Sequence, residues 1–206
     1  MSFEQNILLN RIVNHLILHS CSLDDVGLFH GKTGVVLFFA HYARYTGIEM
    51  YDDFAEKLLE DIANNISKAL PINMEFGLCG IGWGINYLIQ NGFMKGDPNE
   101  ILADIDEKIM ERDLRRVKDL SLETGLMGIY YYIQSRMEFS VCNGKDVPFD
   151  QSYLSEWRDV AGKMNVCDSL NILSLISEKI EPKDFSTWDL GLVNGCAGYG
   201  LKTMMR

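Results

Sequence analysis

Four copies of a G-x-x-G motif divide this chain, and an apolar and aromatic run follows each copy. The motifs are Gly31-Lys32-Thr33-Gly34, Gly77-Leu78-Cys79-Gly80, Gly125-Leu126-Met127-Gly128 and Gly195-Cys196-Ala197-Gly198, and the runs after them cover residues 35–40, 81–89, 129–133 and 199–205. One such motif in a chain with 18 glycines would mean little. Four that each open an apolar segment indicate a structural repeat. The sequence therefore predicts buried helices that are each entered through a glycine.

Amphipathic segments alternate with these apolar runs. Residues 51–66 carry apolar side chains at i, i+3, i+4 and i+7 with charged residues opposite, which is typical of a helix with one wet face. Asp97-Pro98 supplies an N-cap and a first-turn proline for a helix that runs to about residue 109. Further helices are expected near 7–18, 150–163 and 168–180. No segment predicts a strand, so we expect an all-α fold: a partial or small α/α toroid, with inner helices entered through G-x-x-G motifs.

Composition limits the class of protein. At 206 residues, with 47% hydrophobic side chains, the chain fits one globular domain over residues 1–206. The five scattered cysteines form no C-x-x-C pair, and no targeting signal or membrane span is apparent, so a cytoplasmic location is expected. The net charge of −10 disfavours nucleic acid and anionic membranes as partners.

Two longer motifs resemble those of a known family. Residues 27–34 read G-L-F-H-G-K-T-G and residues 191–198 read G-L-V-N-G-C-A-G. They are similar to the G-L-x-H-G-x-x-G and C-terminal G-L-x-x-G-x-A-G motifs of lanthionine synthetase C-like proteins. The resemblance implies an α/α toroid whose inner helices begin at one mouth. Active members of the family hold zinc there and add cysteine thiols to dehydrated residues of a peptide.

The zinc-binding residues of that family are missing. Glu75 stands where active members carry a cysteine two residues before the glycine, and Glu123-Thr124 replaces the Cys-His pair of the next repeat. Cys79 and Cys196 lie inside their motifs and do not align with these positions. Zinc needs three or four ligands of suitable softness. We therefore expect no zinc cofactor and no zinc-dependent thioether cyclisation in this chain.

The chain is also short for this family. The resemblance implies seven helical hairpins, and only four motifs are present. An incomplete ring leaves apolar flanks that another chain must cover. The sequence therefore predicts a homo-oligomer or a hetero-complex formed through an open edge.

His30, Glu75 and Glu123 are the candidate catalytic residues. If the toroid forms, both glutamates would lie near His30, as an acid/base set or as oxygen ligands of a hard cation. Structural roles compete: a histidine at a helix start commonly bonds to backbone, and acids at helix N-termini interact favourably with the helix dipole. We favour the structural roles.

Trp83, Tyr87 and Tyr130 are candidate substrate-binding residues, since they could line a central cavity. Aromatic residues at helical spacing more often fill a core, and we favour that interpretation.

The function that the sequence favours is a non-catalytic or altered accessory component in peptide maturation, with a peptide or a partner protein as ligand. Two alternatives remain open. Glu75 and Glu123 could form the carboxylate pair of a carbohydrate-active enzyme, or the chain could be a helical scaffold that binds another protein.

Overall fold

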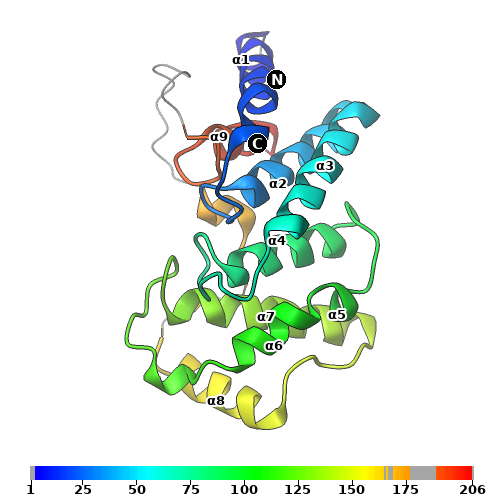
Figure 1. Cartoon of the computed structure of the whole chain (residues 1–206). Helices are drawn as coiled ribbons and strands as arrows, with labels where there is room; N and C mark the ends of the chain where they lie inside the picture. Colours follow the sequence, from blue (N-terminus) through cyan, green and yellow to red (C-terminus); the bar gives the residue numbers. More distant parts are fainter. Residues whose placement is uncertain (1–2, 165, 167–168, 177–188, 206) are drawn as a thin grey trace. The chain divides into compact units, whose positions relative to one another are not determined.

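The structure, a computed structural model, describes residues 3–164, 166, 169–176 and 189–205 (Figure 1). Helices account for all regular structure in these residues, apart from one isolated bridge between Asp189 and Gly195. The α-helices are α1 (Phe3–His19), α2 (Lys32–Thr46), α3 (Glu49–Asn65), α4 (Leu78–Gln90), α5 (Pro98–Ile101), α6 (Ala103–Met110), α7 (Leu126–Asn143), α8 (Gln151–Ala161) and α9 (Cys196–Met204). Short 3-10 turns are η1 (Ser20–Ser22), η2 (Leu114–Arg116) and η3 (Ile172–Leu175). The prediction of an all-α fold is confirmed.

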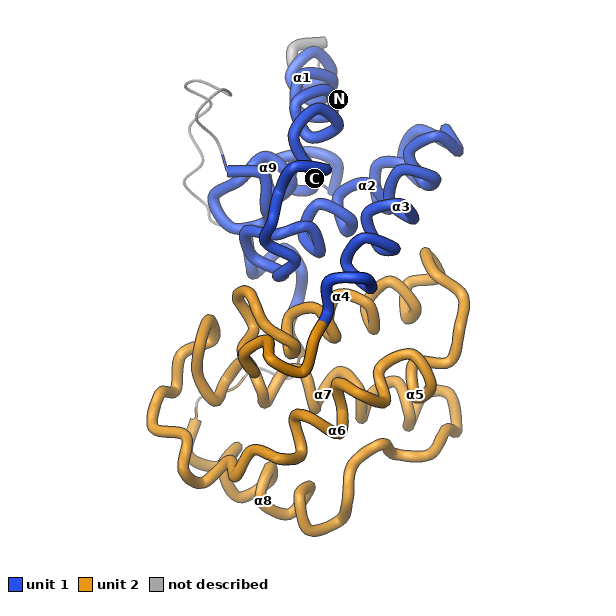
Figure 2. Tube along the Cα trace, viewed as in Figure 1, with its two compact units in different colours: residues 1–66, 171–206 blue, residues 67–170 orange. Residues whose placement is uncertain are grey.

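The chain divides into two compact units (Figure 2). Unit 1 consists of Met1–Ile66 and Asn171–Arg206, and unit 2 is Ser67–Leu170. Unit 1 therefore contains α1, α2, α3 and α9 from the two ends of the sequence, and unit 2 contains α4 to α8. A single domain was expected from the sequence, and each unit is described by itself below.

The apolar helices α2, α4, α7 and α9 each begin directly after the first glycine of a G-x-x-G motif. We call the preceding segments the entry loops: residues 25–31, 71–77, 119–125 and 189–195, numbered one to four. In each, the N–H of the first helical residue donates to the carbonyl six residues before the glycine. These bonds are Lys32 to Asp25 (2.9 Å), Leu78 to Pro71 (2.9 Å), Leu126 to Asp119 (2.8 Å) and Cys196 to Asp189 (2.8 Å). The entry loop's backbone thus satisfies a helix-start donor that a side chain would otherwise cap.

This loop geometry explains why the motif begins with glycine. A Cβ atom at Gly31, Gly77, Gly125 or Gly195 would lie closer than 3 Å to backbone atoms of its own entry loop. The second glycine is restricted in the same way in three copies, because a Cβ there would meet the carbonyl six residues earlier. These pairs are Gly34 with Leu28, Gly128 with Leu122 and Gly198 with Leu192. The repeat seen in the sequence is therefore a repeated steric requirement.

The glycine-entered helices pack in pairs, α9 with α2 in unit 1 and α4 with α7 in unit 2. In unit 1 the N–H of Val193 donates to the carbonyl of Phe29 at 2.9 Å, and in unit 2 the N–H of Glu75 donates to that of Glu123 at 3.0 Å. All four residues lie two positions before the first glycine of their motif. Within each unit, the two entry loops are therefore joined by a hydrogen bond between equivalent residues.

The helix contacts repeat as well. Gly200 on α9 lies against the ring of Phe38 on α2, and Gly82 on α4 lies against the ring of Tyr132 on α7. Each glycine is five residues after its motif begins, and each ring is seven residues after the partner motif begins. The same kind of helix interface therefore occurs twice. The fourth repeat packs on the first, and the second repeat packs on the third in the same way.

This pairing removes the argument for an open edge at the chain's ends. An incomplete ring was expected from the sequence to leave apolar flanks for another chain to cover. Instead α9 packs against both α2 and α1, and its Leu201 is fully buried. The predicted self-association no longer follows from this helix, and the oligomeric state stays a prediction.

The amphipathic helices follow the predicted stripe, with one difference. α3 buries Ala55, Leu58 and Ile62 and packs on α2. The helix predicted from Asp97 to about 109 has the expected cap, with the Asp97 carboxylate accepting from the Asn99 N–H at 3.0 Å, but Leu102 divides it into α5 and α6.

The helix predicted at 168–180 is wrong for its described part. Residues 169–176 hold only the 3-10 turn η3, and residues 168 and 177–180 lie outside the described residues.

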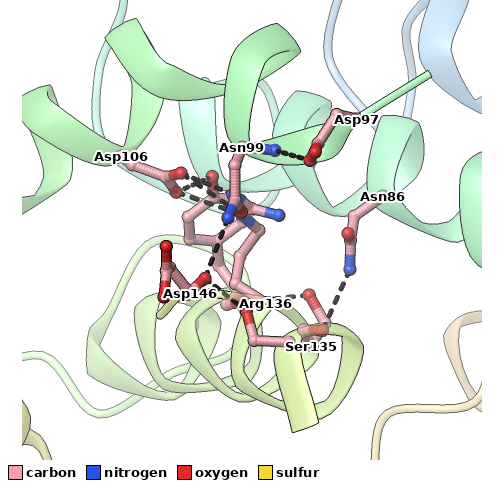
Figure 3. Close-up of polar contacts among 9 residues, drawn as sticks. Asn86, Asp97, Asn99, Asp106, Ser135, Arg136 and Asp146 are labelled. Carbon is pink, nitrogen blue, oxygen red and sulfur yellow. Dashed lines mark hydrogen bonds and ion pairs between the residues drawn. The ribbon is translucent and has the colours of Figure 1, made fainter. Parts of the chain in front are cut away.

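A buried ion pair fixes α7 against α6 in unit 2. Nη2 of Arg136, a fully buried side chain, donates to the carboxylate of Asp106 at 2.8 Å, and the Tyr132 hydroxyl donates to the same carboxylate at 2.5 Å. Nη2 also donates to the amide oxygen of Asn99 at 2.9 Å, which ties in α5 (Figure 3). Burial raises the pKa of Asp106, opposed by the hydrogen bonds and charge of Arg136. The pair joins elements 30 residues apart in sequence.

His41 on α2 makes the stability of the chain sensitive to acid. Its pKa is lowered to about 4, first by burial and second by the positive charge of Arg44. The unfolded chain takes up this proton near pH 6.5, so acid favours unfolding. The contribution of neutral His41 to the free energy of unfolding is complete above about pH 6.5 and is lost as the pH falls through 4. The loss amounts to about 2–3 kcal/mol after allowance for partial exposure.

Urea unfolding of the wild type and of His41→Gln at about pH 7 and about pH 4.5 tests this expectation. The drop in unfolding free energy between the two pH values should be smaller in the variant. Equal drops in both proteins would contradict it.

Candidate functional site

The second and third entry loops bring Glu75 and Glu123 together in unit 2. The backbone N–H groups of Met74 and Glu75 both donate to the carbonyl of Glu123, each at 3.0 Å. Glu75 is half-buried and Glu123 is exposed. Two of the three residues that replace the family's zinc ligands therefore lie in entry loops that are bonded to each other, just before the starts of α4 and α7.

Thr124, the third replacement, is engaged within its own loop. Its hydroxyl donates to the Asp119 carboxylate at 2.6 Å, and the same carboxylate accepts from the Ser121 hydroxyl at 3.0 Å and the Ser121 N–H at 2.9 Å. These bonds, that from Thr124 first, lower the pKa of Asp119. Thr124 thus braces the third entry loop.

His30 lies in unit 1, where the first and fourth entry loops meet. The backbone of Gly191 approaches the backbone of His30 so closely that a Cβ on Gly191 would overlap it. His30 is half-buried and immediately precedes the N-cap Gly31 of α2. Since it belongs to a different unit from Glu75 and Glu123, its proximity to them stays a prediction.

The two cysteines closest to the helix starts are fully buried. Burial raises the pKa of Cys79 far above its ordinary value. Burial and, second, the negative charge of Asp189 raise the pKa of Cys196 to about 12. Both lie inside their G-x-x-G motifs and do not align with the family's zinc-ligand positions, so neither replaces a missing ligand.

The residues at the zinc positions do not fit the metal as the family binds it. They offer two carboxylates in place of two sulfurs, and a hydroxyl already bonded to Asp119 in place of an imidazole. In the described part of the chain no group of three or more His, Cys, Asp or Glu residues is arranged to hold a metal. We therefore derive no chemical step through zinc.

The predicted substrate-binding aromatics make contacts typical of a core. Trp83 is buried and stacks on Tyr87 with ring centroids 5.4 Å apart. Tyr130 is buried and stacks on Trp157 with ring centroids 5.1 Å apart. These contacts agree with the packing role that we favoured, and contact with a substrate stays untested.

Two polar interactions of unit 2 were not predicted from the sequence. The Asp119-Leu120-Ser121 spacing is a local turn signal that could have been read from the sequence. Arg136 lies in the C-terminal half of α7, which also carries Gln134 and Glu138, so the sequence marks neither its burial nor its partner Asp106.

The fold and the entry loops define a class of all-α repeat proteins with glycine-entered helices. Comparison with known families identifies it: the model of the lanthionine synthetase C-like protein family matches residues 22–204. The chain belongs to the lanthionine synthetase C-like family. No curated protein and no solved structure gave a significant match. No helix among the described residues is long and apolar enough to cross a membrane.

Proposed function

We propose that this chain is a peptide-binding accessory protein of peptide maturation that does not carry out zinc-dependent thioether formation. One observation carries the proposal: a family scaffold retains its four entry loops while Glu75, Glu123 and Thr124 occupy the zinc positions. Carboxylates and a hydroxyl neither hold zinc in the family's manner nor acidify a thiol. The scaffold therefore supports binding better than it supports the family's reaction.

The test uses a fluorescein-labelled peptide that contains one cysteine and one dehydrated serine. The proposal expects a saturable rise in anisotropy when the chain is added, while alkylation followed by mass spectrometry finds the peptide thiol still free. No binding, or loss of the thiol in proportion to the amount of chain, would overturn it.

The carboxylate pair remains a second candidate because the entry-loop bond brings Glu75 and Glu123 together. A glycosidase requires the two carboxyl groups to face one cleft at about 5–10 Å. Hydrolysis of an aryl glycoside, abolished by Glu75→Gln and by Glu123→Gln, would favour this activity over the accessory role. A helical scaffold for a partner protein, the third alternative, would show neither hydrolysis nor binding of the dehydrated peptide.

A further inference from the structure

A hollow lies between α1 and α3 in unit 1, away from every entry loop. Its volume is about 170 Å³. That is smaller than the roughly 300–1,000 Å³ of small-molecule sites, but it suits a single bulky side chain. The lining residues are Ile17 from α1 and Met50, Tyr51, Asp53, Phe54 and Lys57 from α3.

The apolar part of this hollow is open to solvent. Met50, which lines it, is 58% exposed. The floor is held by the core, because the ring of Phe54 packs edge-on against Phe39 of α2 at 4.7 Å. A rigid apolar floor with exposed apolar edges is typical of a site that receives an anchor side chain.

The α3 wall of the hollow determines the charge of the occupant. At 100° per residue, the exposed acids of α3 form a stripe next to the face that carries Met50 and Phe54, and Lys57 lies between the stripe and that face. These acids are Glu49, Asp52, Asp53, Glu56 and Glu60, and Lys57 is the one cation of α3. A cationic segment would therefore be attracted to this wall and an anionic one repelled.

We propose that the α1–α3 hollow is a docking site for a basic peptide segment that inserts one bulky apolar side chain and places lysines or arginines along the acidic stripe. A second copy of this chain fits less well, because a molecule with a formal charge of −10 repels its copy on average. The inference deepens the proposed function by naming the kind of peptide and the surface that it contacts.

The test measures anisotropy of a short fluorescein-labelled peptide with a central phenylalanine and lysines on both sides. Two further peptides carry alanine in place of the phenylalanine, or glutamates in place of the lysines. Met50→Asp and Asp53→Lys change the apolar edge and the acidic wall separately at exposed positions. The matched controls are Val141→Asp on α7, also an exposed apolar residue, and Glu100→Lys on α5, an exposed acid.

The site predicts that the lysine–phenylalanine peptide binds and that added salt weakens it. Met50→Asp and Asp53→Lys should each raise the dissociation constant about tenfold or more, whereas both controls should leave it unchanged. Equal binding of the glutamate peptide, or unchanged binding in both variants, would overturn the site. So would light scattering that shows a dimer which Met50→Asp dissociates, because a second copy would then be the occupant.

This outcome is separable from the proposed function. If the dehydrated, cysteine-containing peptide binds and Met50→Asp has no effect, the accessory role stands and the α1–α3 hollow does not. If neither peptide binds, both proposals are wrong.

Discussion

Replacing Arg136 with methionine should lower the free energy of unfolding by about 3–5 kcal/mol. The change leaves the carboxylate of Asp106, which is 2% exposed, without the guanidinium that compensates its charge. The Tyr132 hydroxyl alone cannot replace it. Urea unfolding at neutral pH measures the loss.

Two comparisons identify its cause. Arg115→Met removes an exposed arginine that pairs with Asp113 and Glu156, and it should cost no more than about 1 kcal/mol. Arg136→Met combined with Asp106→Leu should regain much of the lost stability, because no charge stays buried. A small loss in Arg136→Met, or no recovery in the double variant, would contradict this account of the ion pair.

Replacing Gly77 with alanine should lower the unfolding free energy by about 3 kcal/mol. The new Cβ would meet the carbonyl oxygen of Pro71 and the N–H of Asn73, both backbone atoms of the second entry loop. The Pro71 carbonyl cannot move away without breaking the bond from the Leu78 N–H that starts α4. The backbone fixes the position of the alanine Cβ, so no side-chain rotation can relieve the overlap.

Gly162→Ala is the matched control for this change. A Cβ at Gly162, after α8, has its nearest neighbour at 3.8 Å, which is ordinary contact. Its stability should change by no more than about 1 kcal/mol, and an increase is expected from the loss of freedom in the unfolded chain. Similar thermal midpoints for Gly77→Ala and Gly162→Ala would remove the steric explanation of the repeat.

The repeat could be predicted from the sequence because its cause is local. Each first glycine meets backbone atoms of the six residues before it, so the requirement appears at the same place in every copy. The helix starts at Gly31, Gly77, Gly125 and Gly195 were predicted for the same reason. The reason itself, a bond from backbone to backbone across the entry loop, leaves no mark in side-chain types.

The pairing of the repeats could not be predicted in this way. Gly200 and Phe38 lie far apart in the sequence, and neither segment's sequence indicates that the two residues are in contact. The open-edge prediction compared four motifs with seven hairpins and did not anticipate the contact of α9 with α2. Arg136 and Asp106 are a second case, because the mixed polar and apolar sequence around Arg136 shows neither that its side chain is buried nor that Asp106 is its partner.

The candidate site was predicted more by analogy than by chemistry. Glu75 and Glu123 were placed together on the basis of equivalent repeat positions, and the bond between their backbones follows that equivalence. The role of Thr124 could not be foreseen from the ligand positions, since it depends on the local carboxylate of Asp119. The α1–α3 hollow is lined by residues of two helices that are separated in the sequence, and no motif marks it.

Zinc content measured by elemental analysis of the purified chain tests the central claim most directly. The claim is that the family scaffold is retained and its metal chemistry is lost. The account predicts no stoichiometric zinc, even after incubation with the metal and removal of the excess. One zinc per chain that disappears in Glu75→Ala and Glu123→Ala would show that carboxylates have taken over the site, and would contradict the account.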